Sequence, residues 1–440
     1  MNMSKMYLFF ASILLAILFN SCGSKYLEVD KQVLQTKIYD PTAIKYQSLQ
    51  QSTVLYLDHS TCVIDAVQNS EVFKAVRPNL GQYCDTLRLI KGDSFESIPL
   101  NRKENKVSEV LETINTDISF ADIRSAVFKI CNDNQQAILI SDCESYANGR
   151  FLDLEPYMSE PFKIWLSKGH SIYIITEPYQ EKYKGRTYDK KRFFIIFTDD
   201  KLQAPISNVI KAEIQGLMEN GVCTWFKMTN SDISIESPKS DMVNPNLTFN
   251  VDYLNGFEFI SIDDSWEAIR EYVMKLDKYG EPIPEEKSEP LISNLILVNG
   301  ENFKINDIQV EATNITSKYL ALEDSSVTAN EINISDGFVL DKVALKSNKL
   351  NVLLTDKIFT QSYLLGKKYG GNLIRLDFVI TQIELNPYES NVFEWQSIWS
   401  TNNAICVSKS IDNAIRDVNV IPTSPNRRVI HTIFIKTESY

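Results

Sequence analysis

Between residues 51 and 235, short apolar runs alternate with segments of helical spacing, and this alternation limits the possible folds of the chain most strongly. The apolar runs are Val54–Leu57, Leu87–Ile90, Ala137–Ile140, Ile172–Ile175 and Phe193–Phe197. Between two of them, Phe120–Cys131 carries apolar residues at three- and four-residue steps, which is typical of an amphipathic helix. Short buried strands that alternate with such helices predict an α/β domain over 51–235, with a doubly wound, mostly parallel sheet covered on both faces.

Two of the apolar runs end in polar residues. One run ends at Asp58, with Ser60 two residues later, and another ends at Ser141 and Asp142. The carboxyl ends of parallel strands meet at one edge of a sheet, and ligands bind in the crevice outside them. Carboxylate and hydroxyl oxygens are the ligands that hard cations such as Mg²⁺ prefer. We therefore predict an oxygen-rich site where these two strands end, in which a second acid can hold a coordinated water.

From about residue 236 the chain consists mainly of strand-like segments, several with apolar residues at every second position. Asn, Asp, Gly and Pro separate these segments. The composition of 278–290, with three prolines and several acids, is typical of an exposed linker. We predict a β-rich, sandwich-like domain over 236–440 with a linker near 278–290.

Two helices are expected within this β-rich half. Asp264 and Glu267 have the spacing of a capping box, so a helix should begin after Asp264. A second short helix is expected at Lys409–Val418.

The N-terminus has the layout of a secretory signal. Lys5 is followed by an apolar run from Met6 to Phe19, which is shorter than the ~20 residues that a membrane span needs. The segment "LFNSC" after it resembles a bacterial lipoprotein box, and the resemblance implies that the chain is cut before Cys22 and lipidated there. Residues 1–22 would then be the signal peptide and 23–50 a tether. The alternative is an ordinary signal peptide with an incidental cysteine.

Charge and cysteine content exclude two common classes of site. The net charge of −12 argues against a general nucleic-acid surface, which needs clustered lysine and arginine. The chain has three histidines and no CxxC pair, so a zinc site of thiolate and imidazole ligands is not expected.

The motifs at the two strand ends resemble those of the von Willebrand factor type A domain, the fold also used by integrin inserted domains. That family has a metal-ion-dependent adhesion site, with Asp-x-Ser-x-Ser after the first strand, a later threonine, and an aspartate after the fourth strand. Here "DHSTC" supplies Asp58 and Ser60, with Cys62 in place of the last serine. The segment "NTDISFADIRSAVFKI" nominates Thr116 as the threonine, and "ILISDCES" nominates Asp142 as the later acid.

The resemblance implies a function as well as a fold. Asp58, Ser60 and Thr116 would contact Mg²⁺ or another divalent cation, and Asp142 would hold it through water. An open coordination position would take an acidic side chain of a protein or peptide partner. The chain would then be a binding protein of the bacterial cell envelope, held to a membrane by its lipid, and not an enzyme. His59 is expected to be a solvent-facing loop residue.

The family positions of Cys62 and Cys143 lie on neighbouring loops around the metal. The resemblance therefore also implies a possible disulfide between these two cysteines across the site. The alternative is that both are unpaired small residues.

Three other functions remain open. The chain can be a structural envelope lipoprotein whose metal site is not functional. Asp58, Ser141 and "FTDDK" (199–201 within it) look superficially similar to the motifs of haloacid-dehalogenase-like phosphatases, but Ser60 stands where that family has a second acid. Trp395 and Trp399 suggest a carbohydrate platform, although aromatic residues more often fill a core.

Overall fold

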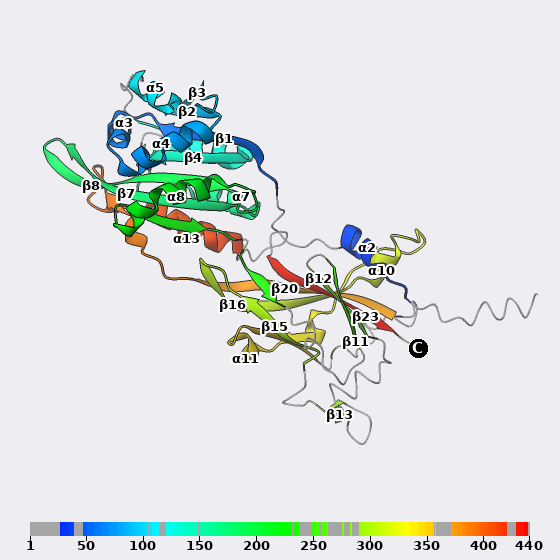
Figure 1. Ribbon diagram of the computed structural model, residues 1–440. Coiled ribbons are helices and arrows are strands. Elements are labelled where there is room, and N and C mark those ends of the chain that lie inside the picture. The colour runs from blue at the N-terminus through cyan, green and yellow to red at the C-terminus, as the bar shows by residue number, and fades with distance from the viewer. Residues whose placement is uncertain are drawn as a thin grey trace, which may run out of the picture.

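The computed structural model describes residues 27–38, 47–103, 105–113, 120–147, 150–230, 232–236, 249–254, 257–262, 275–276, 282–283, 290–355, 357, 371–419 and 428–438. The chain forms an α/β unit around a seven-stranded sheet and a β-rich unit around sheets of six and four strands (Figure 1). The predicted combination of an α/β domain and a β-rich region is confirmed at this level.

The seven-stranded sheet has the strand order β3-β2-β1-β4-β8-β7-β9. Its strands are β1 (Gln50–Asp58), β2 (Thr86–Lys91), β3 (Ser94–Pro99), β4 (Gln135–Ser141), β7 (Ser171–Tyr183), β8 (Arg186–Thr198) and β9 (Thr224–Met228). β1 is parallel to both β2 and β4, whereas β8 is antiparallel to β4 and β7, and β9 is antiparallel to β7. The sheet is thus more mixed than the sequence predicted.

A tight hairpin explains this difference. Tyr183 pairs with Arg186, and the two residues between them, Lys184 and Gly185, have φ of 49° and 77°. Positive φ at both central residues is typical of the two-residue turn that joins antiparallel strands. A mostly parallel sheet would need a long crossover connection between β7 and β8, whereas the chain here turns back directly.

Helices cover both faces of this sheet. Because successive strand residues point to opposite faces, Leu55 and Leu57 pack with α3 (Thr61–Gln68), α4 (Glu71–Tyr83), α5 (Lys106–Thr113) and α8 (Ile206–Glu219). Tyr56 and Leu139 face the other side, with α6 (Ile123–Asp133), α7 (Ser159–Ser167) and α13 (Cys406–Asn419).

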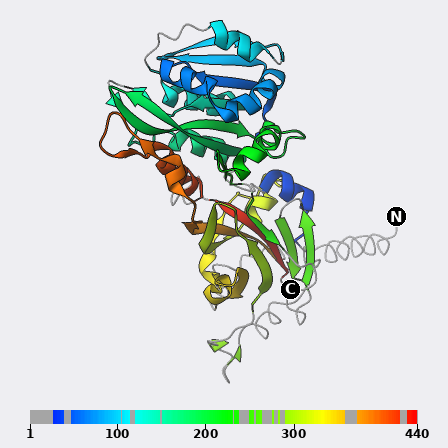
Figure 2. The ribbon, with the colours of Figure 1, turned by 60° about the vertical axis from the view of Figure 1, so that its left-hand side comes forward.

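The helix α13 belongs to the C-terminal half of the sequence but packs on the α/β unit (Figure 2). The Ser410 hydroxyl accepts a hydrogen bond from the Met158 amide at 3.2 Å, and the Asp153 carbonyl accepts one from the Cys406 amide at 2.9 Å. The helix expected at Lys409–Val418 is therefore present, yet it lies outside the β-rich unit.

The β-rich unit contains two sheets. The six-stranded sheet has the order β11-β12-β23-β20-β16-β17, and the four-stranded sheet the order β10-β15-β19-β18. Their strands are β10 (Ser234–Glu236), β11 (Phe249–Leu254), β12 (Phe257–Ile262), β15 (Ile292–Val298), β16 (Phe303–Asn314), β17 (Ile332–Asn333), β18 (Phe338–Leu340), β19 (Lys349–Leu354), β20 (Gly371–Leu385) and β23 (Val429–Glu438). The short helices α10 (Thr316–Leu320) and α11 (Lys342–Leu345) connect strands of this unit.

Two expected features of this half are described only in part. The helix expected after Asp264 lies outside the described residues. The expected linker near 278–290 is described only at Pro290 and at β14 (Pro282–Ile283), which pairs with β13 (Lys275–Leu276).

The segment 27–38, expected to be part of a tether, is packed on the β-rich unit. It forms α2 (Lys31–Val33) and a π-helical turn (Leu34–Ile38), and Leu34 is buried against Tyr319 and Phe434. The Asp30 amide donates a hydrogen bond to the Tyr319 hydroxyl at 2.6 Å. Cys22 lies outside the described residues. Among the helices that are described, none is both long enough and apolar enough to cross a membrane.

Candidate functional site

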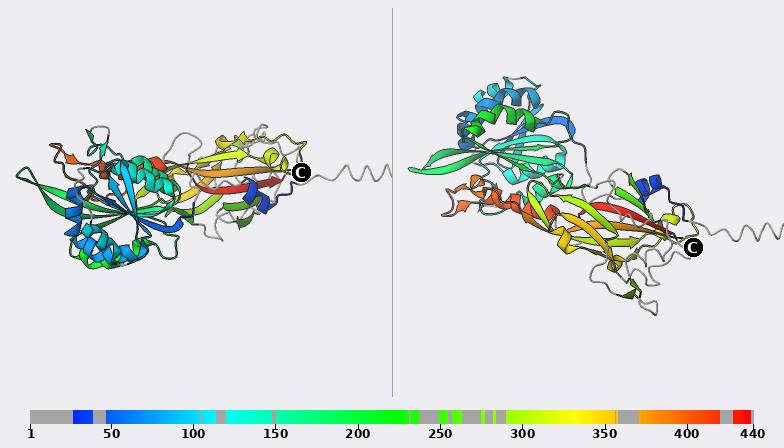
Figure 3. Two further views of the ribbon diagram at one scale, coloured as in Figure 1. Left: turned by 90° about the horizontal axis from the view of Figure 1, so that it is seen from above. Right: turned by 60° about the horizontal axis from the view of Figure 1, so that its bottom comes forward.

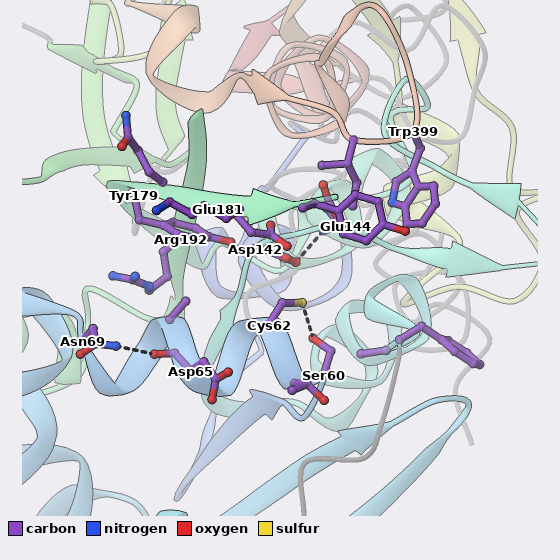
Figure 4. A pocket seen from close by; sticks show the side chains of 18 of the residues that line it. Ser60, Cys62, Asp65, Asn69, Asp142, Glu144, Tyr179, Glu181, Arg192 and Trp399 are labelled. Atoms are coloured by element: carbon purple, nitrogen blue, oxygen red, sulfur yellow. Dashed lines mark hydrogen bonds between the residues drawn. The ribbon is translucent and has the colours of Figure 1, made fainter. Parts of the chain in front are cut away.

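A cavity of about 620 Å³ lies at the carboxyl ends of β1 and β4 (Figure 4). Ser60, Thr61 and Cys62 line it from the segment after β1, and Asp142 and Glu144 from the segment after β4. Its other walls come from the outer half of β7 and from Ile398 and Trp399. The volume is within the ~300–1,000 Å³ typical of small-ligand sites.

Asp58 ends β1 and lies beneath the cavity, which it does not line. One carboxylate oxygen accepts hydrogen bonds from the Ser60 amide at 2.9 Å and the Ser60 hydroxyl at 2.7 Å, and the other accepts one from the Ser141 hydroxyl at 2.8 Å. Burial raises the pKa of Asp58, although these hydrogen bonds act in the opposite direction. The carboxylate therefore positions Ser60 and joins the ends of β1 and β4.

Asp142 follows β4 and lines the cavity, although its side chain is mostly buried. One of its carboxylate oxygens accepts a hydrogen bond from the Glu144 amide at 3.0 Å. Burial and then the negative charges of Glu144 and Asp58 raise the pKa of Asp142 well above its ordinary value. Asp142 and Ser60 thus face the cavity, and Asp58 supports them, whereas the sequence assigned direct contact to Asp58 and an indirect role to Asp142.

Glu144, which sequence reasoning missed, has a buried cationic partner. Lys190 of β8 forms an ion pair with Glu144 and lies 3.9 Å from a carboxylate oxygen of Glu181. Burial lowers the pKa of Lys190, but the charges of Glu144, Asp142 and Glu181 outweigh it and leave that pKa raised. Lys190 is therefore charged and compensates Glu144.

The charge of Lys190 also lowers the pKa of Asp142, but burial and the neighbouring acids outweigh it. Within the part of the chain that the structure describes, neither Asp58 nor Asp142 forms an ion pair. Burial raises the pKa of both carboxyl groups, and the charge of Asp58 raises that of Asp142 further. A proton or a bound cation stabilises such buried acids. The two acids and the Ser60 hydroxyl, all oxygen donors, suit a hard cation such as Mg²⁺. The described residues contain no group of three or more His, Cys, Asp or Glu side chains arranged to hold a metal, so such an ion would need hydroxyl or water ligands as well.

The disulfide implied by the resemblance is not formed in this structure, since Cys62 and Cys143 are both free thiols. Cys62 lies in the first turn of α3 and packs towards the α3 face of the sheet, with its sulfur 3.5 Å from the Ser60 hydroxyl oxygen. Cys143 has a φ of 58° and is buried on the opposite face, where its carbonyl accepts a weak hydrogen bond from the Cys406 thiol at 3.8 Å. The two side chains point into different cores, which explains why they are not paired.

Thr116 and His59 were the other residues considered from the sequence at this site. Thr116 lies outside the described residues, and the helix after it begins at Ile123 with Asp122 as its N-cap, whose carboxylate accepts from the Ser125 amide at 3.1 Å. The expectation for His59 was wrong, because its side chain is buried and its amide donates to the Ile90 carbonyl at 3.2 Å. Burial and the nearby Lys91 charge lower the pKa of His59.

The acids of "FTDDK" lie far from Asp58 along the sheet. Because β8 is antiparallel to β4, its carboxyl end lies beside the start of β4, where Phe197 pairs with Ala137. Asp58 and Asp142 stand at the opposite edge. At the β8 end of the sheet, Asp200 accepts a hydrogen bond from the Tyr173 hydroxyl at 2.6 Å and forms an ion pair with Lys227 at 3.0 Å. The arrangement that suggested a phosphatase is therefore not assembled.

Aromatic residues form one wall of the cavity. Trp399 stacks on Phe151 with ring centroids 4.2 Å apart and an angle of 9°, and Tyr183 lies 5.8 Å from Trp399. Trp399 is about half exposed, whereas Trp395 is buried and donates from its indole nitrogen to Glu144 at 3.4 Å. Only one of the two tryptophans considered from the sequence thus faces the cavity.

The structure therefore brings Asp58, Ser60 and Asp142 together and adds Glu144, Lys190 and Trp399 to the same region. A sequence signal for Lys190 was available in the "KG" pair, Lys184 and Gly185, because a two-residue turn at this pair folds β8 back along β7. Comparisons with known proteins returned no match, whether to a family model, to a curated protein or to a solved structure.

Proposed function

We propose that this chain is a lipid-anchored binding protein of the bacterial cell envelope. In this proposal the cavity of the α/β unit holds a divalent cation and, through it, an acidic side chain of a protein or peptide partner. The observation that carries the proposal is a pair of buried carboxyl groups with raised pKa values, Asp142 in the wall of the cavity and Asp58 beneath it, neither of which forms an ion pair within the described residues. A bound cation would balance their charge.

The position of each side chain suggests its role. Asp142 and Ser60 line the cavity and would contact the ion directly. Asp58 would hold the Ser60 hydroxyl in place through the 2.7 Å hydrogen bond and add its own negative charge from below. The ion would supply positive charge and a free coordination position for a carboxylate.

The proposal also includes a von Willebrand A-like fold for the α/β unit, a sandwich-like fold for the β-rich unit, and a lipid anchor at Cys22. The neighbouring parallel strands β2, β1 and β4, with Asp58 and Asp142 at their carboxyl ends, support a von Willebrand A-like unit. Buried residues from both sheets of the β-rich unit share one core, which supports a sandwich-like arrangement. The apolar run Met6–Phe19 before Cys22 supports the lipid anchor.

Titration calorimetry with Mg²⁺ and Mn²⁺ tests the proposal. The wild-type protein should bind one ion, and Asp142→Asn and Ser60→Ala should weaken binding at least tenfold, which corresponds to ~1.4 kcal/mol. Asp122→Asn is the matched control, because Asp122 caps α6 and does not line the cavity. Equal affinities for Asp142→Asn and the wild type would contradict the proposal.

One observation favours a second candidate, a structural lipoprotein whose metal site is not functional. Cys62 replaces the last serine of the motif, and both oxygens of Asp58 already accept hydrogen bonds from serines. A thiol is a soft ligand that suits Mg²⁺ poorly. If the wild-type protein binds neither ion, this second candidate is favoured.

A further inference from the structure

The hairpin of β7 and β8 extends beyond the sheet as a two-stranded arm, which we define as residues 177–192. β9 pairs with β7 only over 172–176, and β4 pairs with β8 only over 193–197, so the arm strands pair mainly with each other. Figure 1 shows this hairpin projecting from the α/β unit, and Figure 3 shows it at the end of the molecule far from the C-terminus. A two-stranded ribbon is only marginally stable alone, and on its β8 side this arm already packs on β21 (Trp395–Gln396).

The tip of the arm is basic in a chain whose net charge is −12. Lys182, Lys184 and Arg186 are all exposed, and no ion pair to any of them occurs within the described residues. Of the other charges of the arm, Arg192 pairs with Glu177, Lys190 pairs with Glu144, and Asp189 accepts a hydrogen bond from the Gln180 amide group at 3.2 Å, whereas Glu181 and Lys191 are partly buried. The three tip cations are therefore available to an anionic partner.

The arm also has an open strand edge, on the side of β7 that pairs with β9 nearer the sheet. Beyond Thr176 no described strand pairs with the outer side of β7, and the residues from Tyr179 to Tyr183 line the cavity. On the β8 side, the Asp189 amide already donates to the Gln396 side chain at 3.0 Å. An extended peptide can add to a free edge through its backbone, with alternate side chains giving specificity.

We propose that the arm binds an extended, acidic segment of a partner protein. The segment pairs with β7 beyond Thr176 and places its carboxylates against Lys182, Lys184 and Arg186. One further carboxylate reaches the ion at the cavity floor, and only this last contact rests on the proposed function. A protein segment is favoured over an acidic glycan because a glycan cannot form a strand ladder with the open edge.

Fluorescence anisotropy with fluorescein-labelled decaglutamate tests the arm in the full chain, with Mg²⁺ present. The triple variant Lys182→Glu, Lys184→Glu, Arg186→Glu should weaken binding about tenfold or more. The matched control reverses three exposed lysines of the β-rich unit, Lys304, Lys346 and Lys349, and should change affinity less than twofold, although its net charge change is the same.

A second ligand separates strand pairing from simple charge attraction. Decaglutamate that is N-methylated at every residue keeps its charge but has no amide hydrogen for a ladder on either edge, and it should bind about tenfold more weakly. Equal losses in the arm and control variants would overturn the proposal, as would equal binding of the two peptides. Tighter binding of polygalacturonate than of decaglutamate would also overturn it, in favour of a glycan partner.

Ion titration of the same variants keeps the two proposals distinguishable. The arm variant should bind Mg²⁺ as the wild type does, which also shows that it is folded. If the wild type binds no ion but decaglutamate affinity still depends on the arm, the proposed function fails and the docking role of the arm stands.

Discussion

The substitution Asp142→Asn should stabilise the ion-free protein while abolishing ion binding. Asparagine has the same shape as aspartate, and its side-chain oxygen can still accept the 3.0 Å hydrogen bond from the Glu144 amide, so only the charge is removed. Burial and the charges of Glu144 and Asp58 raise the pKa of Asp142 well above the ordinary 3.8. The folded protein therefore retains a proton on Asp142 at pH values where the unfolded chain has released it.

This pKa difference sets the sign and the limit of the effect. Between pH 3.8 and the folded pKa of Asp142, the folded state binds more protons, so stability falls as the pH rises through that window and stays reduced above it. Each pH unit of the window costs at most about 1.4 kcal/mol, so the gain from Asp142→Asn should grow as the pH rises from 3.8 and level off above the folded pKa of Asp142. Below pH 3.8 the gain should vanish.

Thermal unfolding followed by dye fluorescence, with EDTA and across pH 3.5 to 7, measures this gain. A gain of 1 kcal/mol raises the melting temperature of a domain of this size by about 2–4 °C. Excess Mg²⁺ should stabilise the wild type by about 2.7 kcal/mol at one hundred times its Kd and should leave Asp142→Asn unchanged.

Asp200→Asn is the contrasting control. Burial raises the pKa of Asp200, but hydrogen bonds from Tyr173, Lys227 and Ser171 outweigh burial and leave that pKa lowered. Asp200→Asn should therefore destabilise the protein at neutral pH, and the loss should disappear as the pH falls through the folded pKa. A lower melting temperature for Asp142→Asn at pH 7 in EDTA would refute the claim that the negative charge of Asp142 destabilises the folded protein.

Three other substitutions test separate parts of the structure. Cys62→Ser places a hard oxygen beside Ser60, where the sulfur now lies 3.5 Å from the hydroxyl oxygen, and should tighten Mg²⁺ binding about tenfold in calorimetry; an unchanged Kd contradicts this. Leu34→Ala should cost about 2–5 kcal/mol and expose the N-terminal segment to limited proteolysis, while Lys37→Ala, at an exposed position, should be neutral. Trp399→Ala removes the aromatic wall that stacks on Phe151 and should weaken decaglutamate binding several-fold without changing Mg²⁺ affinity; loss of both affinities would indicate a collapsed cavity instead.

Part of the candidate site could be predicted because it depends on neighbours in sequence and on strand direction. Asp58 and Ser60 are held together by a local turn, and Asp142 joins them because β1 and β4 are parallel. Glu144 was missed because its role depends on Lys190, which lies 46 residues away in sequence. The exposure of His59 was predicted wrongly because its position after a strand said nothing of the Ile90 strand end beside it.

The sequence by itself determined the central strands of the α/β unit, the helices α6 and α13, the β-rich character of the second half, and the residues that end β1 and β4. These depend on apolar periodicity and on capping and turn residues, which act over a few positions. Only the tertiary structure decided that β8 runs against β4, that α13 returns to the α/β unit, and that Cys62 and Cys143 face different cores. Such choices depend on which apolar surfaces bury each other across long separations in sequence, and local pattern carries no information about that pairing.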